Sequence, residues 1–376
     1  MSAPATERPL RSAAATRLVS LDVFRGATMA LMILVNTAGG WPQVFSQLRH
    51  ASWNGWTLTD TVFPSFLWIT GVAMTLSFAR RRERGGGRGQ LLVHTLRRAA
   101  VLFVLGLIVY EYPYFDLKHL RMPGVLQRIA VCYFLGATLF LYCSRRALVW
   151  WTTGLLAVYW LLVKVAPVPG YGAGILNSPE GSLPQYLDLL TMRGFLMSPR
   201  WDPEGILSTL PALASTLLGI LAGYLLRSKR EPVEKAAWLF TAGNTLIVAG
   251  AVVNIWLPIN KNLWSSSFTL LMAGISTCAF AFCYWLLDAQ GRGRSLTRPF
   301  AIFGMNAIAI YVIAELGDTT LAVIKVGGVS LNRVLFAQYT AAFGGKFDSL
   351  LWGVSFDAVM FAIAWVMYRR KWFIKV

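Results

Sequence analysis

Charged residues are scarce in this sequence of 376 residues. They make up 14% of the chain, whereas a soluble domain carries roughly 25%. Apolar residues account for 56%, and the mean hydropathy is +0.54. This composition excludes an ordinary soluble domain and indicates a protein embedded in a membrane.

Cysteine is also rare, and its placement excludes two of its common uses. All four cysteines lie in apolar segments, and the sequence has neither a Cys-x-x-Cys pair nor paired histidines: Cys132, Cys143, Cys278 and Cys283. Such positions are typical of small core residues, so we expect no disulfide framework and no metal site. We also find no nucleotide-binding fingerprint, soluble domain or convincing internal repeat.

Apolar runs of about twenty residues recur along the chain, and this is the length that spans a bilayer core. We predict an all-α fold, a polytopic bundle of transmembrane helices, because lipid offers no partner for open backbone groups. Residues 20–376 form a single domain after a polar tail at 1–19, without a cleavable signal peptide. An interfacial or re-entrant helix is expected within 317–349. Ten spans are predicted, at about 20–40, 60–79, 91–110, 124–143, 147–166, 205–227, 236–257, 265–287, 299–316 and 350–368.

Positive charge is concentrated in a few short segments. The net charge is +18, which in a soluble protein would suggest nucleic acid. Here Lys and Arg gather near the termini and in alternate loops, most densely at 80–88, as is typical of cytoplasmic loops. We therefore predict both termini in the cytoplasm and no nucleic-acid partner. A secondary possibility for the 80–90 loop is binding to lipid headgroups or nucleotide phosphates. The prevalence of Arg over Lys favours a bacterial cytoplasmic (inner) membrane.

The segment 36–64 is a polar, aromatic loop between two predicted spans, on the extracytoplasmic side by the charge rule. An imidazole can accept and return a proton near neutral pH, which acyl transfer requires. The alternative is an interfacial histidine within an aromatic belt. The chemically capable residues of this loop include Asn36, His50, Trp53, Asn54, Trp56 and Asp60.

Further polar residues lie inside or beside apolar runs. Arg25 can pair with Asp22 on one helix face. Arg128 either faces the bundle interior or extends to the interface. Glu204 either caps a helix start or belongs to a site, and Asn306 should face the interior. The additional site candidates are Gln127, Asn260, Lys261 and Asn262.

Seven sequence blocks together resemble the heparan-α-glucosaminide N-acetyltransferase family, from about residue 17 to the last span. They are SLDVFRG, VNTAGG, HASWNGWTLTDTVFPSF, RMPGVLQRIAVCY, WDPEGILSTLPA, LPINKNLWSSSF and FGMNAIAIY. The resemblance implies transfer of an acetyl group from cytoplasmic acetyl-CoA to an amino sugar or glycan across the membrane. The family's essential histidine falls on His50 and a nearby asparagine on Asn36. It also implies a homodimer.

These residues suggest a mechanism in which His50 is the general base. It acts in direct transfer or through an acetyl-imidazole. Asn36 would donate to the thioester oxygen, and Asp60 would orient the imidazole. Substrate contacts are expected from Trp53, Asn54, Trp56, Glu204, Asn260 and Asn306, and acetyl-CoA contacts from Arg25, Gln127, Arg128, Lys261 and Asn262.

The alternative function is a membrane transporter for amino sugars of the N-acetylglucosamine type. Such a permease would bind its substrate near the bilayer midplane, often at broken helices. The polar clusters of this sequence lie mainly at one edge of the predicted bundle. This distribution favours chemistry at a surface-facing chamber.

Overall fold

A computed structural model describes residues 18–39, 43–116, 118 and 120–374, so most of the predicted tail at 1–19 lies outside the described residues. Short helical turns are η2 (Ser46–Leu48), η3 (Leu58–Thr61) and η4 (Trp285–Ala289). Two antiparallel hairpins pair β1 (Pro167–Val168) with β2 (Gly172–Ala173) and β3 (Lys325–Val326) with β4 (Val329–Ser330). The α-helices are α1 (Val19–Asn36), α2 (Val62–Glu83), α3 (Arg88–Glu111), α4 (Val125–Tyr142), α5 (Arg145–Val165), α6 (Leu183–Met192), α7 (Thr209–Leu226), α8 (Pro232–Val253), α9 (Ser266–Tyr284), α10 (Arg298–Met305), α11 (Ala307–Val323), α12 (Leu331–Ala342) and α13 (Lys346–Arg369).

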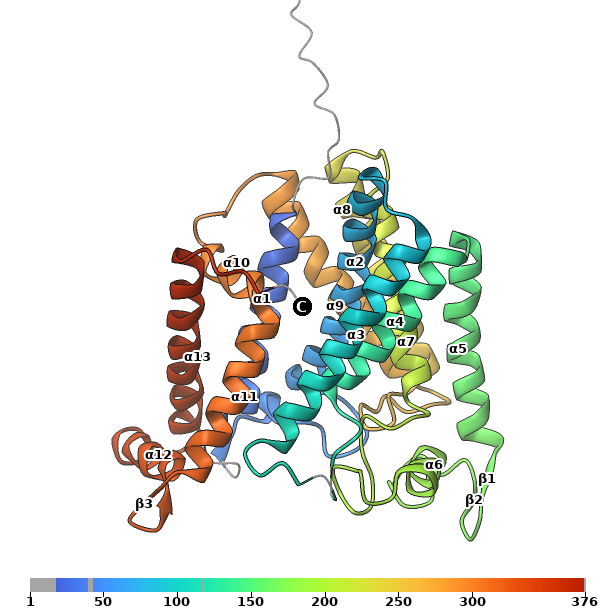
Figure 1. Cartoon of the computed structure of the whole chain (residues 1–376). Coiled ribbons are helices and arrows are strands. Elements are labelled where there is room, and N and C mark those ends of the chain that lie inside the picture. Colours follow the sequence, from blue (N-terminus) through green and yellow to red (C-terminus); the bar gives the residue numbers. More distant parts are fainter. Residues whose placement is uncertain (1–17, 40–42, 117, 119, 375–376) are drawn as a thin grey trace, which may run out of the picture.

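The predicted all-α polytopic bundle is confirmed. Within the described residues, nine helices are long and apolar enough to cross a membrane, and the bent pair α10–α11 could form a tenth span. The nine unbroken spans agree with the sequence prediction to within a few residues at each end. The expected helix within 317–349 is α12, which lies at one end of the bundle beside the β3–β4 hairpin (Figure 1).

The helices form two groups on either side of the middle of the molecule (Figure 1). On one side, α1 packs against α10, α11 and α13, and their buried side chains form one apolar cluster. On the other side, α2, α3, α4, α5, α7 and α9 share a second cluster, and α8 packs against α9. We name the two ends of the bundle by their residues. The arginine-rich end is where α1 begins and α2 ends, and the His50 end carries α6, α12 and both hairpins.

Close backbone approach joins α1 to α10. A Cβ atom added to Gly26 would lie 1.7 Å from the carbonyl oxygen of Phe300, and one added to Gly304 would lie 2.0 Å from that of Asp22. Small residues allow membrane helices to pack this tightly and gain van der Waals contact, since lipid provides no hydrophobic drive between helices. The two glycines therefore set the spacing of this helix pair.

The prediction of one continuous span at 299–316 is wrong. The chain breaks at Asn306, and α10 and α11 meet at 82°. Asn306 leaves the helical conformation, with φ −122° and ψ 31°. Its side chain donates a hydrogen bond to the carbonyl of Trp372 and accepts one from the backbone N–H of Ile374, both at 3.0 Å. The break is thus occupied by the C-terminal segment, which satisfies this buried amide.

Candidate active site

His50 and Asp60 meet in the loop between α1 and α2. Asp60 lies in η3 and is only 1% exposed. Its Oδ1 is 2.7 Å from Nδ1 of His50, and its Oδ2 accepts hydrogen bonds from the backbone N–H groups of Ala51 and Thr57 at 3.1 and 3.0 Å. The carboxylate is therefore held by the backbone on one side and faces the imidazole on the other. The His50 side chain is 46% exposed, so a ligand can reach it.

Lys261 approaches the same imidazole from the loop between α8 and α9. Its Nζ lies 2.9 Å from Nδ1 and 3.3 Å from Nε2 of His50, and 3.5 Å from Oδ1 of Asp60. Burial lowers the pKa of the Lys261 amine, against the opposing effect of the Asp60 and Glu204 carboxylates. Two basic groups and one buried carboxylate thus share a single site.

Backbone and amide contacts tie the two loops together. The N–H of Gly55 donates to the carbonyl of Ile259 at 2.7 Å, and Asn260 donates through Nδ2 to Oδ1 of Asn54 at 3.1 Å. Asn54 in turn donates to Oδ1 of Asn177 at 3.0 Å. Asn54 and Asn260 were expected as substrate contacts. In the structure their side chains bind each other and thereby join the His50 loop to the Lys261 loop.

The two tryptophans of the His50 loop differ in how they are used. Trp53 donates its indole N–H to the carbonyl of Leu176 at 2.9 Å, and its ring meets Trp201 edge to face at 5.7 Å. Trp56 is 42% exposed. Of the pair, Trp56 presents more surface to a ligand, whereas Trp53 anchors the loop between α5 and α7.

A second ionic cluster joins the loop between α3 and α4 to the loop between α6 and α7. Arg121 donates to both carboxylate oxygens of Asp202, at 3.0 and 3.1 Å, and to Glu204 at 2.7 Å. Burial raises the pKa of Glu204 despite Arg121. For Asp202 burial acts in the same direction, but hydrogen bonds and the charge of Arg121 outweigh it and lower the pKa. The helix α7 begins only at Thr209, so Glu204 lies too far ahead of it to act as its cap. Glu204 pairs with Arg121 instead.

Three other predicted residues, Arg128, Gln127 and Asn262, lie near these two ionic clusters. Arg128 is buried over the Trp264 ring at 5.2 Å and donates to the carbonyl of Gly205 at 2.9 Å. Gln127 is 2% exposed, and its amide atoms have no hydrogen-bond partner in the described part of the chain. Asn262 is partly buried in the turn after Lys261.

Asn36, the last residue of α1, is paired with α11, a helix of the same group. It donates to Oε1 of Glu315 in α11 at 2.9 Å. No hydrogen bond joins Asn36 to His50 among the residues that the structure describes. An amide nitrogen carries two protons, so a second donor of Asn36 is available for a ligand.

A cavity of about 590 Å³ occupies the middle of the bundle. Its lining extends from Leu21 to Met32 along α1, which is about 16 Å at the helical rise per residue. Its walls are largely apolar, with Met29, Phe66 and Leu102 among them. The cavity therefore extends along α1 and has largely apolar walls, which suits an extended ligand with an apolar or weakly polar arm.

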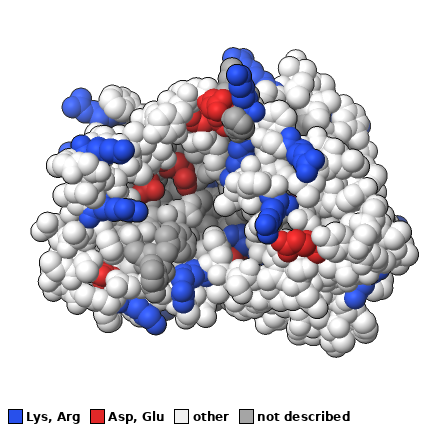
Figure 2. Space-filling view, turned by 90° about the horizontal axis from the view of Figure 1, so that it is seen from below, with Lys and Arg blue, Asp and Glu red and all other residues white. Residues whose placement is uncertain are grey.

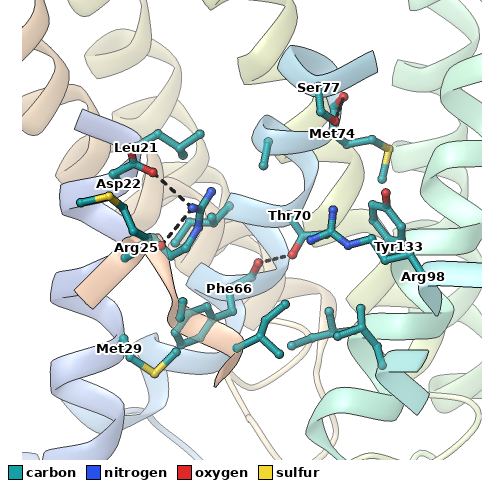
Figure 3. Close-up of a pocket in the computed structure, with 18 of the residues that line it drawn as sticks. Leu21, Asp22, Arg25, Met29, Phe66, Thr70, Met74, Ser77, Arg98 and Tyr133 are labelled. Atoms are coloured by element: carbon teal, nitrogen blue, oxygen red, sulfur yellow. Dashed lines mark hydrogen bonds and ion pairs between the residues drawn. The ribbon is translucent and has the colours of Figure 1, made fainter. Parts of the chain in front are cut away.

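Basic side chains gather toward the arginine-rich end of this cavity: Arg25, Arg80, Arg81, His94 and Arg98. Figure 3 shows Arg25 and Arg98 pointing toward each other from opposite walls. Arg25 contacts Asp22 at 3.4 Å and the carbonyl of Gly304 at 3.2 Å, and Arg98 lies over the Tyr133 ring at 5.1 Å. The buried Nε atoms of Arg80 and Arg98 have no hydrogen-bond partner in the described part of the chain. Arginine is the residue type that most readily pairs with phosphate and carboxylate oxygens, and this end of the cavity is rich in it.

The deep end of the cavity approaches the His50 layer without including His50 in its lining. Tyr311 lines the cavity and lies within electrostatic range of Glu204 and Glu315, and Glu204 in turn interacts with Lys261. Seen from the His50 end, the molecule is hollowed at its centre, with acidic side chains beside the hollow (Figure 2). Charged and polar groups thus lie between the central cavity and the imidazole, within electrostatic range of one another.

One protein-family model matches well over half of this chain. The family model described as heparan-α-glucosaminide N-acetyltransferase, catalytic, matches residues 17–257. The chain belongs to the heparan-α-glucosaminide N-acetyltransferase family. Its relatives include the heparan-α-glucosaminide N-acetyltransferases of Homo sapiens, 29% identical over 431 residues, and Mus musculus, 28% identical over 421 residues.

These alignments cover 99% and 97% of this N-acetyltransferase family member, but 62% and 61% of the human and mouse proteins. The chain thus spans about three fifths of the length of these relatives. The family resemblance inferred from the seven blocks is confirmed. The shared region includes both the His50 loop and the Lys261 loop.

The cationic cavity of this family member was not predicted from the sequence. Arg98 and His94 were not singled out, and the 80–88 cluster was interpreted mainly as a signal for orientation. The position of Arg98, ten residues after the start of α3, could have indicated this site, because a charge at that depth usually faces the bundle interior. The structure also places Arg128 and Lys261 in the His50 layer, apart from the cluster around Arg98.

Proposed function

We propose that this protein is a transmembrane acetyltransferase. It takes the acetyl group of acetyl-CoA and delivers it to the amine of an amino sugar or glycan at the His50 end. The main support for this proposal is the pairing of the half-exposed His50 imidazole with the buried Asp60 carboxylate at 2.7 Å. A base held by an orienting carboxylate is the arrangement that proton removal from a nucleophile requires.

The donor would occupy the central cavity, with its phosphates toward the arginine-rich end. Arg25, Arg98 and the neighbouring Arg80 and Arg81 supply cations there, and arginine suits phosphate oxygens through paired N–H donors. The apolar walls would hold the rest of the ligand and exclude water. In this proposal Arg128 and Lys261, first considered as phosphate contacts, belong instead to the acceptor end.

In the transfer step, the acceptor nitrogen attacks the thioester carbonyl carbon while Nε2 of His50 accepts a proton from that nitrogen. The new C–N bond forms, the C–S bond breaks, and the proton passes from His50 to the departing CoA thiolate. Asn36 would donate its second amide proton to the carbonyl oxygen as negative charge develops there. The products are an N-acetylated sugar and CoA, and the imidazole returns neutral.

The carboxylates near this layer suit an amine acceptor. Glu204 and Glu315 both interact electrostatically with Tyr311, which lines the cavity, and an amino sugar carries a positive charge at neutral pH. Such groups would attract the acceptor before it loses its proton. The exposed Trp56 ring would provide a face for the sugar.

A permease would use a broken helix for substrate contact. The bent pair found among the described residues has its break at Asn306, and both polar side-chain atoms there bind the backbone of the C-terminal segment. This occupation disfavours the transporter alternative and supports acetyl transfer.

The decisive experiment uses purified protein in detergent with radiolabelled acetyl-CoA and glucosamine. His50→Ala should reduce label transfer by about 10²- to 10⁴-fold, the usual contribution of a general base. The control is His119→Ala, which should retain the wild-type rate. Transfer that survives the His50 substitution unchanged would remove the assigned base. Uptake of labelled sugar by proteoliposomes without an acetyl donor would instead support a permease.

A further inference from the structure

Lys261 lies against the face of the His50 ring. One nitrogen at 2.9 Å from Nδ1 and 3.3 Å from Nε2 cannot lie in the ring plane in line with either atom without colliding with the ring. The in-plane position at Nδ1 is taken by Oδ1 of Asp60 at 2.7 Å. The in-plane lone pair of Nε2 therefore stays open to a substrate.

The Lys261 amine is held in this position by its surroundings. Its side chain is 15% exposed, and the preceding residue, Asn260, is fully buried and bonded to Asn54. Two carboxylates interact with the amine, Asp60 and Glu204. No other carboxylate or basic side chain within hydrogen-bond distance of the His50 ring is found in the described part of the chain, and Arg49 next to it is exposed.

His50 and Lys261 thus compete for the one proton whose positive charge balances the negative charge of the Asp60 carboxylate. An ordinary lysine amine is about four pH units more basic than an ordinary imidazole. Burial lowers the pKa of Lys261, but Asp60 and Glu204 oppose that effect. An ammonium at the ring face also repels a second positive charge on the imidazole, and this repulsion is strong at such short distances.

We propose that Lys261 is a positioning residue that carries the positive charge facing Asp60 and thereby keeps the His50 ring neutral. Nδ1–H then points to Asp60, and Nε2 is the free base. Without the ammonium, the buried carboxylate would instead stabilise an imidazolium, which cannot accept the acceptor's proton. The catalytic consequence rests on the proposed acetyltransferase function, whereas the protonation state of His50 can be measured without it.

The test measures the titration of His50 directly. Diethyl pyrocarbonate reacts with neutral imidazole, so the pH dependence of its reaction rate reports the protonation of the ring. The full-length protein would carry His94→Gln and His119→Gln, so that His50 is its only histidine. Modification of the His50 peptide would be followed by mass spectrometry between pH 5 and 9.

Lys261→Met should move the midpoint of this profile to higher pH by about one unit or more, since a charge at this distance is worth more than that in a partly buried site. Lys261→Arg retains the charge and should leave the midpoint near that of the parent. Asp60→Asn should move the midpoint in the opposite direction, below about 6.5, the ordinary value of an imidazole. Size-exclusion profiles would establish that each variant is folded.

An unchanged midpoint in Lys261→Met would overturn the proposal, and so would an Asp60→Asn midpoint at or above that of a free imidazole. The second variant keeps the test valid if the first does not fold. If Lys261 binds the donor instead, Lys261→Met weakens CoA binding and leaves the His50 profile in place. If the protein lacks acetyltransferase activity, the three midpoints still decide the role of Lys261.

Discussion

At the scale of single residues, His50 contacts opposite charges on two sides. The Asp60 carboxylate meets Nδ1 in the ring plane, and the Lys261 amine lies over the face. A carboxylate alone favours the charged imidazole, and an ammonium alone disfavours it. With both groups in place, Asp60 orients the ring and the in-plane lone pair of Nε2 stays open, which is what a general base needs.

The cation that decides donor binding should be Arg98. It projects into the cavity opposite Arg25, and its buried Nε has no hydrogen-bond partner in the described part of the chain (Figure 3). Arg98→Met should weaken CoA binding by about tenfold or more, because a hydrogen bond to a charged group contributes about 1.5–3 kcal/mol. Isothermal titration of the detergent-solubilised protein with CoA measures this loss.

Arg97→Met is the matched control, since Arg97 is the adjacent residue on α3 and is exposed outside the cavity lining. It should bind CoA as the wild type does. Equal losses in the two variants would mean that general positive charge, and not a contact in the cavity, attracts the ligand.

At the scale of helices, the close packing of α1 against α10 depends on two glycines, Gly26 and Gly304, which have no side chain. Gly26→Ala places a methyl group 1.7 Å from the carbonyl oxygen of Phe300, so one backbone must move. Overpacking of this kind costs about 1–3 kcal/mol. The thermal unfolding midpoint in detergent should therefore fall, and Arg25 on the same helix should shift within the cavity.

Gly154→Ala provides the comparison, because Gly154 is also in a helix and a Cβ atom there meets nothing within 4 Å. Its midpoint should stay the same or rise, since alanine favours helix more than glycine does. A Gly26 variant as stable as this control would show that α1 and α10 can separate without loss.

At the scale of the whole molecule, the proposed donor and acceptor sites lie toward opposite ends. The cationic part of the cavity lies near the arginine-rich end, and His50 lies in the loop between α1 and α2 at the other end. The face at that end is hollowed at its centre (Figure 2). The excess of Lys and Arg at the first end predicts that it faces the cytoplasm. The acetyl group would then cross the bilayer while attached to its donor.

Proteoliposomes test this arrangement. Glucosamine trapped inside vesicles should become acetylated when acetyl-CoA is added outside, in the fraction of molecules whose arginine-rich end faces outward. Vesicles with the His50→Ala variant are the control and should show no product. Acetylation only when both substrates share one compartment would contradict transfer through the bundle.

Much of the fold was predictable from the order of residues alone. Runs of apolar side chains determined the all-α bundle, because only helices with satisfied backbones cross a hydrocarbon core. The seven blocks determined the family. His50 and Asp60 could be paired in advance, since both lie in one short loop. The break at Asn306 could not, because its cause is a partner, Trp372–Ile374, at the far end of the chain.

The sequence by itself thus determined the helices, the family and the pairing of His50 with Asp60. Only the tertiary structure decided which cations serve which end. Arg25, Arg80 and Arg98 come from three different helices and share one cavity, whereas Lys261 comes from a distant loop and reaches His50. Hydropathy reports whether a segment is buried in the membrane, but the meeting of charges from separate helices depends on how those helices pack.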